Sequence, residues 1–107
     1  MAQIHAKPGQ VVDLGPLTSQ LRLAKTTAIV KEKCFEAVRL VVHEGVEIPP
    51  HAVSGNITLH CLEGQVILGL SSGDVILRAG DWIYLERGEE HSVRGIVDSS
   101  LLLTILF

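Results

Sequence analysis

Short apolar runs separated by turn-forming residues limit the fold of this chain more than any other feature of its 107 residues. The runs are rich in Val, Ile, Leu and Thr, which favour β-strands. Glycine, proline and acidic turn residues separate them at roughly eight- to twelve-residue intervals. Little of the chain looks helical. This rhythm predicts an all-β sandwich or a closed barrel.

Seven runs are predicted as strands, at residues 34–42, 57–62, 65–70, 74–79, 82–85, 91–96 and 101–107. A further strand is expected across residues 26–32. The pair 65–70 and 74–79 is the clearest hairpin, because Gly73 in the turn "SSGD" can adopt the positive φ that a tight turn needs. The length of the chain corresponds to a single domain.

Charge and hydropathy exclude several classes of partner. The net charge is −3, the isoelectric point is near 5.9, and no run of Lys or Arg is present to neutralise a row of phosphates. The beginning "MAQIHAKPGQ" lacks the apolar core of a secretory signal, and no stretch of eighteen uninterrupted apolar residues follows. We therefore expect a cytoplasmic protein that binds neither nucleic acid nor membrane.

The two cysteines, Cys34 and Cys61, each lie in an apolar run rather than in a C-x-x-C pair. That placement predicts two buried thiols and argues against a disulfide or a zinc knuckle. A reducing compartment follows from this interpretation.

Residues 45–64 carry the first recognisable motif. Gly45 is followed after five residues by His51, after one more by Val53, after three by Ile57 and after six by Gly64. The spacing resembles the first motif of the cupin superfamily, G-x5-H-x-H-x3,4-E-x6-G. Val53 and Ile57 stand where that motif has its second histidine and its glutamate.

A second motif follows in residues 80–95. Gly80, Glu86, Gly88, His91 and Gly95 are spaced as in the second cupin motif, G-x5-P-x-G-x2-H-x3-N. Glu86 replaces the proline and Gly95 the asparagine, and the "SSGD" hairpin joins the two motifs as in cupins.

The chain is therefore identified as a member of the cupin superfamily, similar to small single-domain cupins of the conserved-barrel type 2. The resemblance covers residues 34–107 and implies a jelly-roll β-barrel with a pocket at one end. Residues 1–33 are expected to add one or two strands that complete the barrel or a dimer.

The resemblance leaves an incomplete set of metal ligands. In metal-binding cupins two histidines and a glutamate of the first motif and one histidine of the second hold a divalent ion; here His51 and His91 alone match. Two imidazoles without a carboxylate leave water to complete the coordination, so at most weakly bound Zn, Ni, Fe or Mn is expected. Alternatively, the histidines form a polar pair in an apolar cavity, hydrogen-bonded to water, a backbone carbonyl or a ligand.

The alternation of residues 57–62 indicates which side chains face the pocket. A period of two places Ile57, Leu59 and Cys61 on one face and His60 on the other. The family's glutamate ligand points into the barrel, so its counterpart Ile57 does too, and His60 points away. The resemblance implies a pocket lined by His51, Val53, Ile57, Leu59, Cys61 and His91.

These residues predict a cupin-fold protein that binds a small molecule, with no reaction or catalytic residue assigned. The alternative is a metal-dependent cupin enzyme, such as a dioxygenase or isomerase, that uses His51 and His91 as a reduced ligand set. The sequence has no G-x-S-x-G elbow, P-loop or dinucleotide-binding glycine motif.

Apolar residues on both faces of two strands suggest self-association. The ending "LLLTILF" is interrupted only by Thr104, and "VRLVV" is also apolar on both sides. Because one small barrel cannot cover so much apolar surface, we expect a homodimer. Trp82 and Tyr84 alternate with Ile83 and Leu85, and the sequence does not decide which pair faces the interior.

Overall fold

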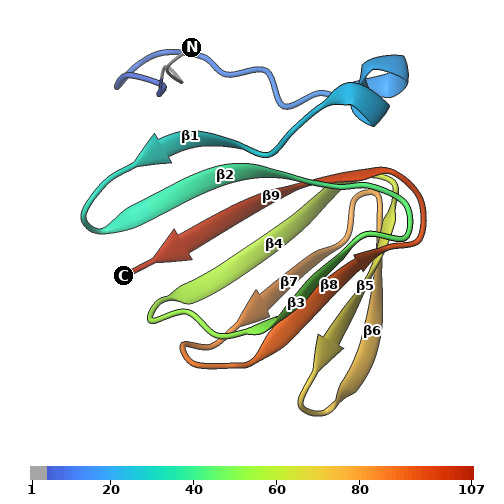
Figure 1. The fold of residues 1–107 in the computed structure, drawn as a ribbon. Coiled ribbons are helices and arrows are strands. Elements are labelled where there is room, and N and C mark those ends of the chain that lie inside the picture. Colours follow the sequence, from blue (N-terminus) through green and yellow to red (C-terminus); the bar gives the residue numbers. More distant parts are fainter. Residues whose placement is uncertain (1–4) are drawn as a thin grey trace.

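Two antiparallel sheets form the molecule in a computed structural model that describes residues 5–107 (Figure 1). Residues 1–4 of the N-terminal segment lie outside the described residues. The elements are a 3-10 helix η1 (Thr18–Leu23) and the strands β1 (Thr27–Lys31), β2 (Phe35–Val42), β3 (Glu47–His51), β4 (Asn56–Glu63), β5 (Gln65–Leu70), β6 (Gly73–Arg78), β7 (Trp82–Leu85), β8 (His91–Gly95) and β9 (Ser99–Leu106).

The strand order defines a jelly-roll barrel. The larger sheet runs β1-β2-β9-β4-β7 and the smaller sheet runs β3-β8-β5-β6, so most neighbours in space are distant in sequence. Figure 1 shows the two sheets as separate layers, with the chain passing back and forth between them. The all-β prediction is confirmed.

All eight predicted strands are present, with ends shifted by at most two residues. One strand was not predicted: β3 contains Pro49 and Pro50, which lack the N–H that a strand donates. The structure accommodates both prolines because β3 lies at the edge of the smaller sheet and pairs with β8.

Turn glycines hold the strand ends in place. Gly45, Gly64, Gly80 and Gly88 all have positive φ, between +75° and +92°. Gly64 is further restricted, since a Cβ added there would meet the Ser99 hydroxyl and the neighbouring backbone. The predicted hairpin is also confirmed: β5 pairs with β6, and Gly73 has a φ of +121°.

The core lies between the sheets and follows the predicted alternation. On β4, Ile57, Leu59 and Cys61 are at most 2% exposed, and they pair in register with Ile105, Leu103 and Leu101 of β9. The smaller sheet supplies the buried side chains Val66, Leu68, Leu77 and Val93. Burying such aliphatic side chains provides the main stabilisation of the fold.

The N-terminal segment is fastened to the outer face of the larger sheet by two charged side chains. Arg39, only 8% exposed, donates to the carbonyl of Gly15 at 2.6 Å. Glu63 accepts the backbone N–H of Leu17 at 2.8 Å and that of Thr18 at 3.3 Å. We refer to residues 13–18 as the strap.

The two cysteines differ in environment. Cys61 is fully buried, as predicted, and both thiols are free. The prediction for Cys34 was wrong: this residue is exposed, because the strand begins only at Phe35 and Cys34 lies in the turn before it. Among residues 5–107, no helix is long and apolar enough to cross a membrane.

Candidate functional site

His51 and His91 lie directly opposite each other on neighbouring strands. His51 ends β3, His91 begins β8, and the two residues are Cα partners in the strand register. Their ring centroids are 4.5 Å apart, with 53° between the ring planes. The structure therefore brings together two side chains that are forty residues apart in the sequence.

The two rings differ in exposure. His91 is 4% exposed and follows the inward alternation of β8, in which Val93 and Gly95 are also buried. His51 is exposed at the end of an edge strand. The pair thus consists of one ring buried in the barrel and one ring exposed at the sheet edge.

Backbone carbonyls hold both rings in the same way. The Nδ1 atom of His51 lies 3.1 Å from the carbonyl oxygen of Pro49, and that of His91 lies 3.0 Å from the carbonyl oxygen of Glu89. Each acceptor is two residues earlier in the chain. Such contacts fix the ring orientation and leave Nε2 for another partner.

The other predicted pocket residues belong to the two apolar core clusters. Val53 is half-buried and packs against the cluster of Ile57, Leu85 and Ile105. Leu59 and Cys61 lie deeper, in the main core cluster. His60 is on the opposite side of β4, as predicted, and pairs with the exposed Trp82.

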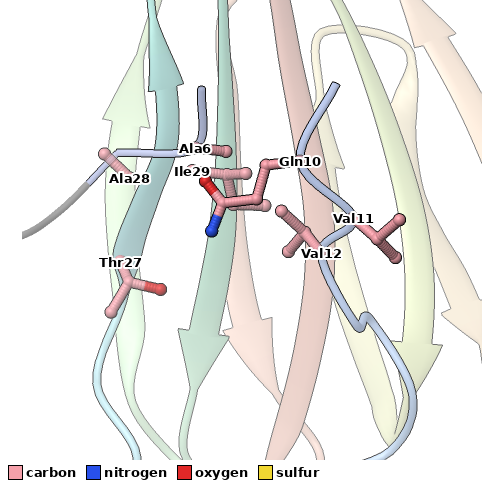
Figure 2. A pocket seen from close by; sticks show the side chains of 7 residues that line it. All are labelled: Ala6, Gln10, Val11, Val12, Thr27, Ala28 and Ile29. Carbon is pink, nitrogen blue, oxygen red and sulfur yellow. The ribbon is translucent and has the colours of Figure 1, made fainter. Parts of the chain in front are cut away.

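Five of the cavities among residues 5–107 have volumes of about 400–420 Å³, and the six predicted pocket residues line none of these five. Figure 2 shows one of them, where Gln10, Val11 and Val12 of the N-terminal segment lie near Thr27 and Ile29 of β1. Another is lined by sequence neighbours of the two histidines and by residues at the end of β5, namely Pro50, Gly69, Leu70, Ser71, Glu90 and Ser92.

The four residues at the motif positions, His51, Val53, Ile57 and His91, do not match the complete metal site of the family. In the part of the chain that the structure describes, no group of three or more His, Cys, Asp or Glu side chains could hold an ion. Val53 and Ile57 provide no donor atoms. A metal at His51 and His91 would have two protein ligands, fewer than the three or four of ordinary zinc sites.

Cys61 has no geometry for nucleophilic chemistry. Burial, together with the negative charge of Asp81, raises the pKa of its thiol to about 11. The sulfur lies 3.6 Å from the carbonyl oxygen of Glu63 and 3.7 Å from that of Gly64. A thiol that stays protonated at neutral pH is a core residue rather than a reactive one.

The turn before His91 carries mostly negative charge. Glu86, Arg87 and Glu90 are exposed, and the half-buried Glu89 accepts a hydrogen bond from the Ser71 hydroxyl at 3.0 Å. This turn therefore adds carboxylates and one guanidinium close in sequence to His91.

The structure also decides the orientation of β7. Trp82 and Tyr84 are 61% and 48% exposed on the outer face, whereas Leu85 is buried and Ile83 packs against the core. Both large aromatic side chains of β7 therefore lie on the outer face of the larger sheet.

Comparison with known proteins agrees with the fold. The family model "Cupin domain" matches residues 38–107. The chain belongs to this family. A cupin superfamily protein from Desulfitobacterium hafniense has a TM-score of 0.78 at 14% identity, with 95% of this chain and 99% of that chain covered.

Two further solved structures resemble this cupin. A Streptococcus pyogenes protein of unknown function has a TM-score of 0.75 at 16% identity, with 99% of this chain and 95% of the other covered. The DMSP lyase DddQ from Ruegeria pomeroyi has a TM-score of 0.71 at 16% identity over 77% of this chain and 46% of its own. At these identities the likeness shows the fold alone. No match was found among curated protein sequences.

Proposed function

We propose that this cupin binds a small, partly apolar molecule at the end of the barrel where His51 and His91 meet. The observation that carries the proposal is the contact between the two rings, each held by a backbone carbonyl. In this proposal Val53, Ile57, Leu59 and Cys61, which belong to the two apolar core clusters, supply the apolar part of the site. Apolar walls with a few oriented polar groups are typical of small-molecule sites.

Burial of His91 supports this proposal. A polar ring that is 4% exposed is costly unless its polar atoms have partners, and Nδ1 has one in Glu89. Among residues 5–107, Nε2 of His91 is not one of the buried atoms left without a partner, so solvent reaches it and a ligand would replace that solvent.

A fragment screen by NMR tests the proposal. We expect some neutral fragments to shift the resonances of His51, Val53 and His91, and to do so no longer in His91→Phe. His60→Phe is the matched control, because His60 lies on the outer face of β4. A library that moves no resonance at the barrel mouth would refute the function.

The second candidate is a metal-dependent cupin enzyme. The contacts between the histidine rings and the backbone carbonyls favour it. Metal-ligating histidines usually donate their other N–H to a carbonyl or carboxylate. Nδ1 of both His51 and His91 lies beside a backbone carbonyl oxygen. DddQ shows that a protein of this fold can be an enzyme. Metal analysis of protein purified without a histidine tag would separate the candidates, with a stoichiometric ion favouring the enzyme.

We further propose a homodimer that uses the outer face of the larger sheet. Trp82 and Tyr84 of β7 are exposed there, and Leu106 of β9 is 46% exposed on the same side. Pairing two such faces would bury the aromatic side chains, which favour interfaces. The cytoplasmic location stays a prediction from the sequence.

A further inference from the structure

We infer that His51 and His91 both act as hydrogen-bond acceptors, so that the site selects neutral or cationic ligands bearing adjacent O–H or N–H groups and rejects carboxylates. This inference rests on the proposed binding function and assigns the chemical class of its ligand.

The first step concerns the proton on each ring. A backbone carbonyl oxygen can only accept a hydrogen bond, so the nitrogen that faces it must donate. Nδ1 of His51 faces Pro49 O at 3.1 Å, and Nδ1 of His91 faces Glu89 O at 3.0 Å. In a neutral imidazole the proton is then on Nδ1, and Nε2 carries a lone pair. Both rings therefore have the same tautomer.

The second step concerns the distance between the rings. The ring centroids are 4.5 Å apart, so one small molecule can contact both rings. Two neighbouring lone pairs attract a molecule with two donors, such as a vicinal diol, a catechol or an amine. An acid anion would instead place its own lone pairs against them.

The third step concerns charge. The segment from Glu86 to His91 contains three carboxylates and one guanidinium, that of Arg87. Arg94 of β8 is exposed and alternates with the buried Val93, so it points away from the barrel interior. Of the charges on β8 and on the turn before it, most would repel an anion at the mouth.

The tautomer is tested without any ligand. Long-range ¹H–¹⁵N NMR at pH 8, where an ordinary imidazole is neutral, distinguishes a protonated Nδ1 from a protonated Nε2. We expect Nδ1–H at both His51 and His91, which is the minor form of free histidine. A protonated Nε2 at either ring would overturn the inference while leaving ligand binding itself open.

The ligand class is tested with three probes of similar size: catechol, its dimethyl ether, and benzoate. We expect catechol to shift the His51 and His91 resonances and to bind at least tenfold more tightly than the other two. His91→Phe, which keeps a buried ring without an acceptor, should lose at least tenfold in catechol affinity, and His60→Phe should lose none. Melting curves confirm that each variant folds.

Three results would contradict the ligand class. They are equal binding of benzoate or the ether, catechol binding that His91→Phe leaves unchanged, and nanomolar zinc binding, which would occupy the Nε2 lone pairs. The ligand class would also be rejected if none of the three probes shifted the resonances of His51 and His91. The wider fragment screen distinguishes that outcome from failure of the binding function, because fragments of another class would then still move the resonances at the mouth.

Discussion

Nη2 of Arg39 and Oε1 of Glu63 lie 4.0 Å apart on the two strands that flank β9, and both side chains hydrogen-bond to the backbone of the strap. The guanidinium donates to strap carbonyls, whereas the carboxylate accepts strap amides and the hydroxyl of Ser100. Because both side chains are largely buried, removing one leaves the other with an uncompensated charge.

Glu63→Gln should loosen the strap. The change removes the charge that faces Arg39 and weakens the acceptors for Leu17 and Thr18, so we expect a loss of about 1–3 kcal/mol in unfolding free energy. Hydrogen exchange of residues 13–24 should accelerate. Glu47→Gln, an exposed change on β3, should stay within about 0.5 kcal/mol of wild type. Equal protection of the strap in both variants would mean that Glu63 does not hold it.

The buried Cys61 thiol should make stability depend on alkaline pH. Its folded pKa of about 11 is above the ordinary value of 9.0, so the folded state favours the protonated thiol. The stabilisation that the protonated thiol gives the folded state is fully present below pH 9 and is lost as the pH rises through 11. At pH 11 the unfolding free energy should be lower by about 2 kcal/mol for this reason. Denaturant titrations should show a smaller difference in unfolding free energy between wild type and Cys61→Ala at pH 11 than at pH 8. Cys34→Ser, at an exposed site, should follow wild type, and a constant difference between wild type and Cys61→Ala would contradict the prediction.

Gly64→Ala should cost more stability than Gly80→Ala. Both positions have a positive φ near +90°, which strains an alanine by about 1–2 kcal/mol. A Cβ at Gly80 meets open space, whereas one at Gly64 overlaps the Ser99 hydroxyl and the backbone of Asp98. We expect Gly64→Ala to lose at least about 1 kcal/mol more, because overpacking adds to the strain. Thermal unfolding of the two variants measures the difference, and equal losses would show that the overlap relaxes.

Restoring the missing donors should create a metal site. Val53→His combined with Ile57→Glu should bind Zn or Ni at least tenfold more tightly than wild type, a gain of about 1.4 kcal/mol. Without metal, the carboxyl at a position now 2% exposed should destabilise the fold by about 1–3 kcal/mol, and added ion should restore stability. Calorimetry and melting curves report both effects. Val53→His with Thr58→Glu, which faces outward, is the control; the same gain there would show that the motif alignment is wrong.

A charge on the outer face should break the proposed dimer. Trp82→Lys introduces a charge where Trp82 is 61% exposed, so the folded monomer should tolerate it. Light scattering behind a sizing column should give a dimer for wild type and a monomer for the variant at micromolar concentration. Ile76→Lys, at an exposed position of β6 in the smaller sheet, should remain dimeric. A monomeric wild type would refute the dimer.

The strands could be predicted because each carries a local signal. The alternation on β4 and the turn glycines are properties of a few neighbouring residues, and the structure follows them closely. The prolines of β3 concealed a strand, because its place at a sheet edge depends on β8, forty residues later. The sequence did not predict which face of β7 is buried, for the same reason. Trp82 and Leu85 differ in what packs against them and not in the pattern of neighbouring residues.

The candidate site could be predicted only in part. Motif spacing brought His51 and His91 together, and the structure places their rings in contact. The contacts of the Pro49 and Glu89 carbonyls with the histidine rings could not be predicted, because every residue has a backbone carbonyl. The strap was also missed, because Glu63 binds Leu17 across forty-six residues through main-chain atoms that any sequence would provide.

The two prolines of β3 also affect how this protein behaves at high concentration. An exposed edge strand normally offers a row of N–H and C=O groups on which another chain can assemble, and this is a common start of aggregation. Consecutive prolines remove two donors from β3, and its pairing with β8 shifts register between Ile48 and His51. The edge of the smaller sheet is thus poorly suited to pair with a strand of another molecule. We therefore do not expect such pairing to cover His51 and His91, which are Cα partners on β3 and β8 at this edge.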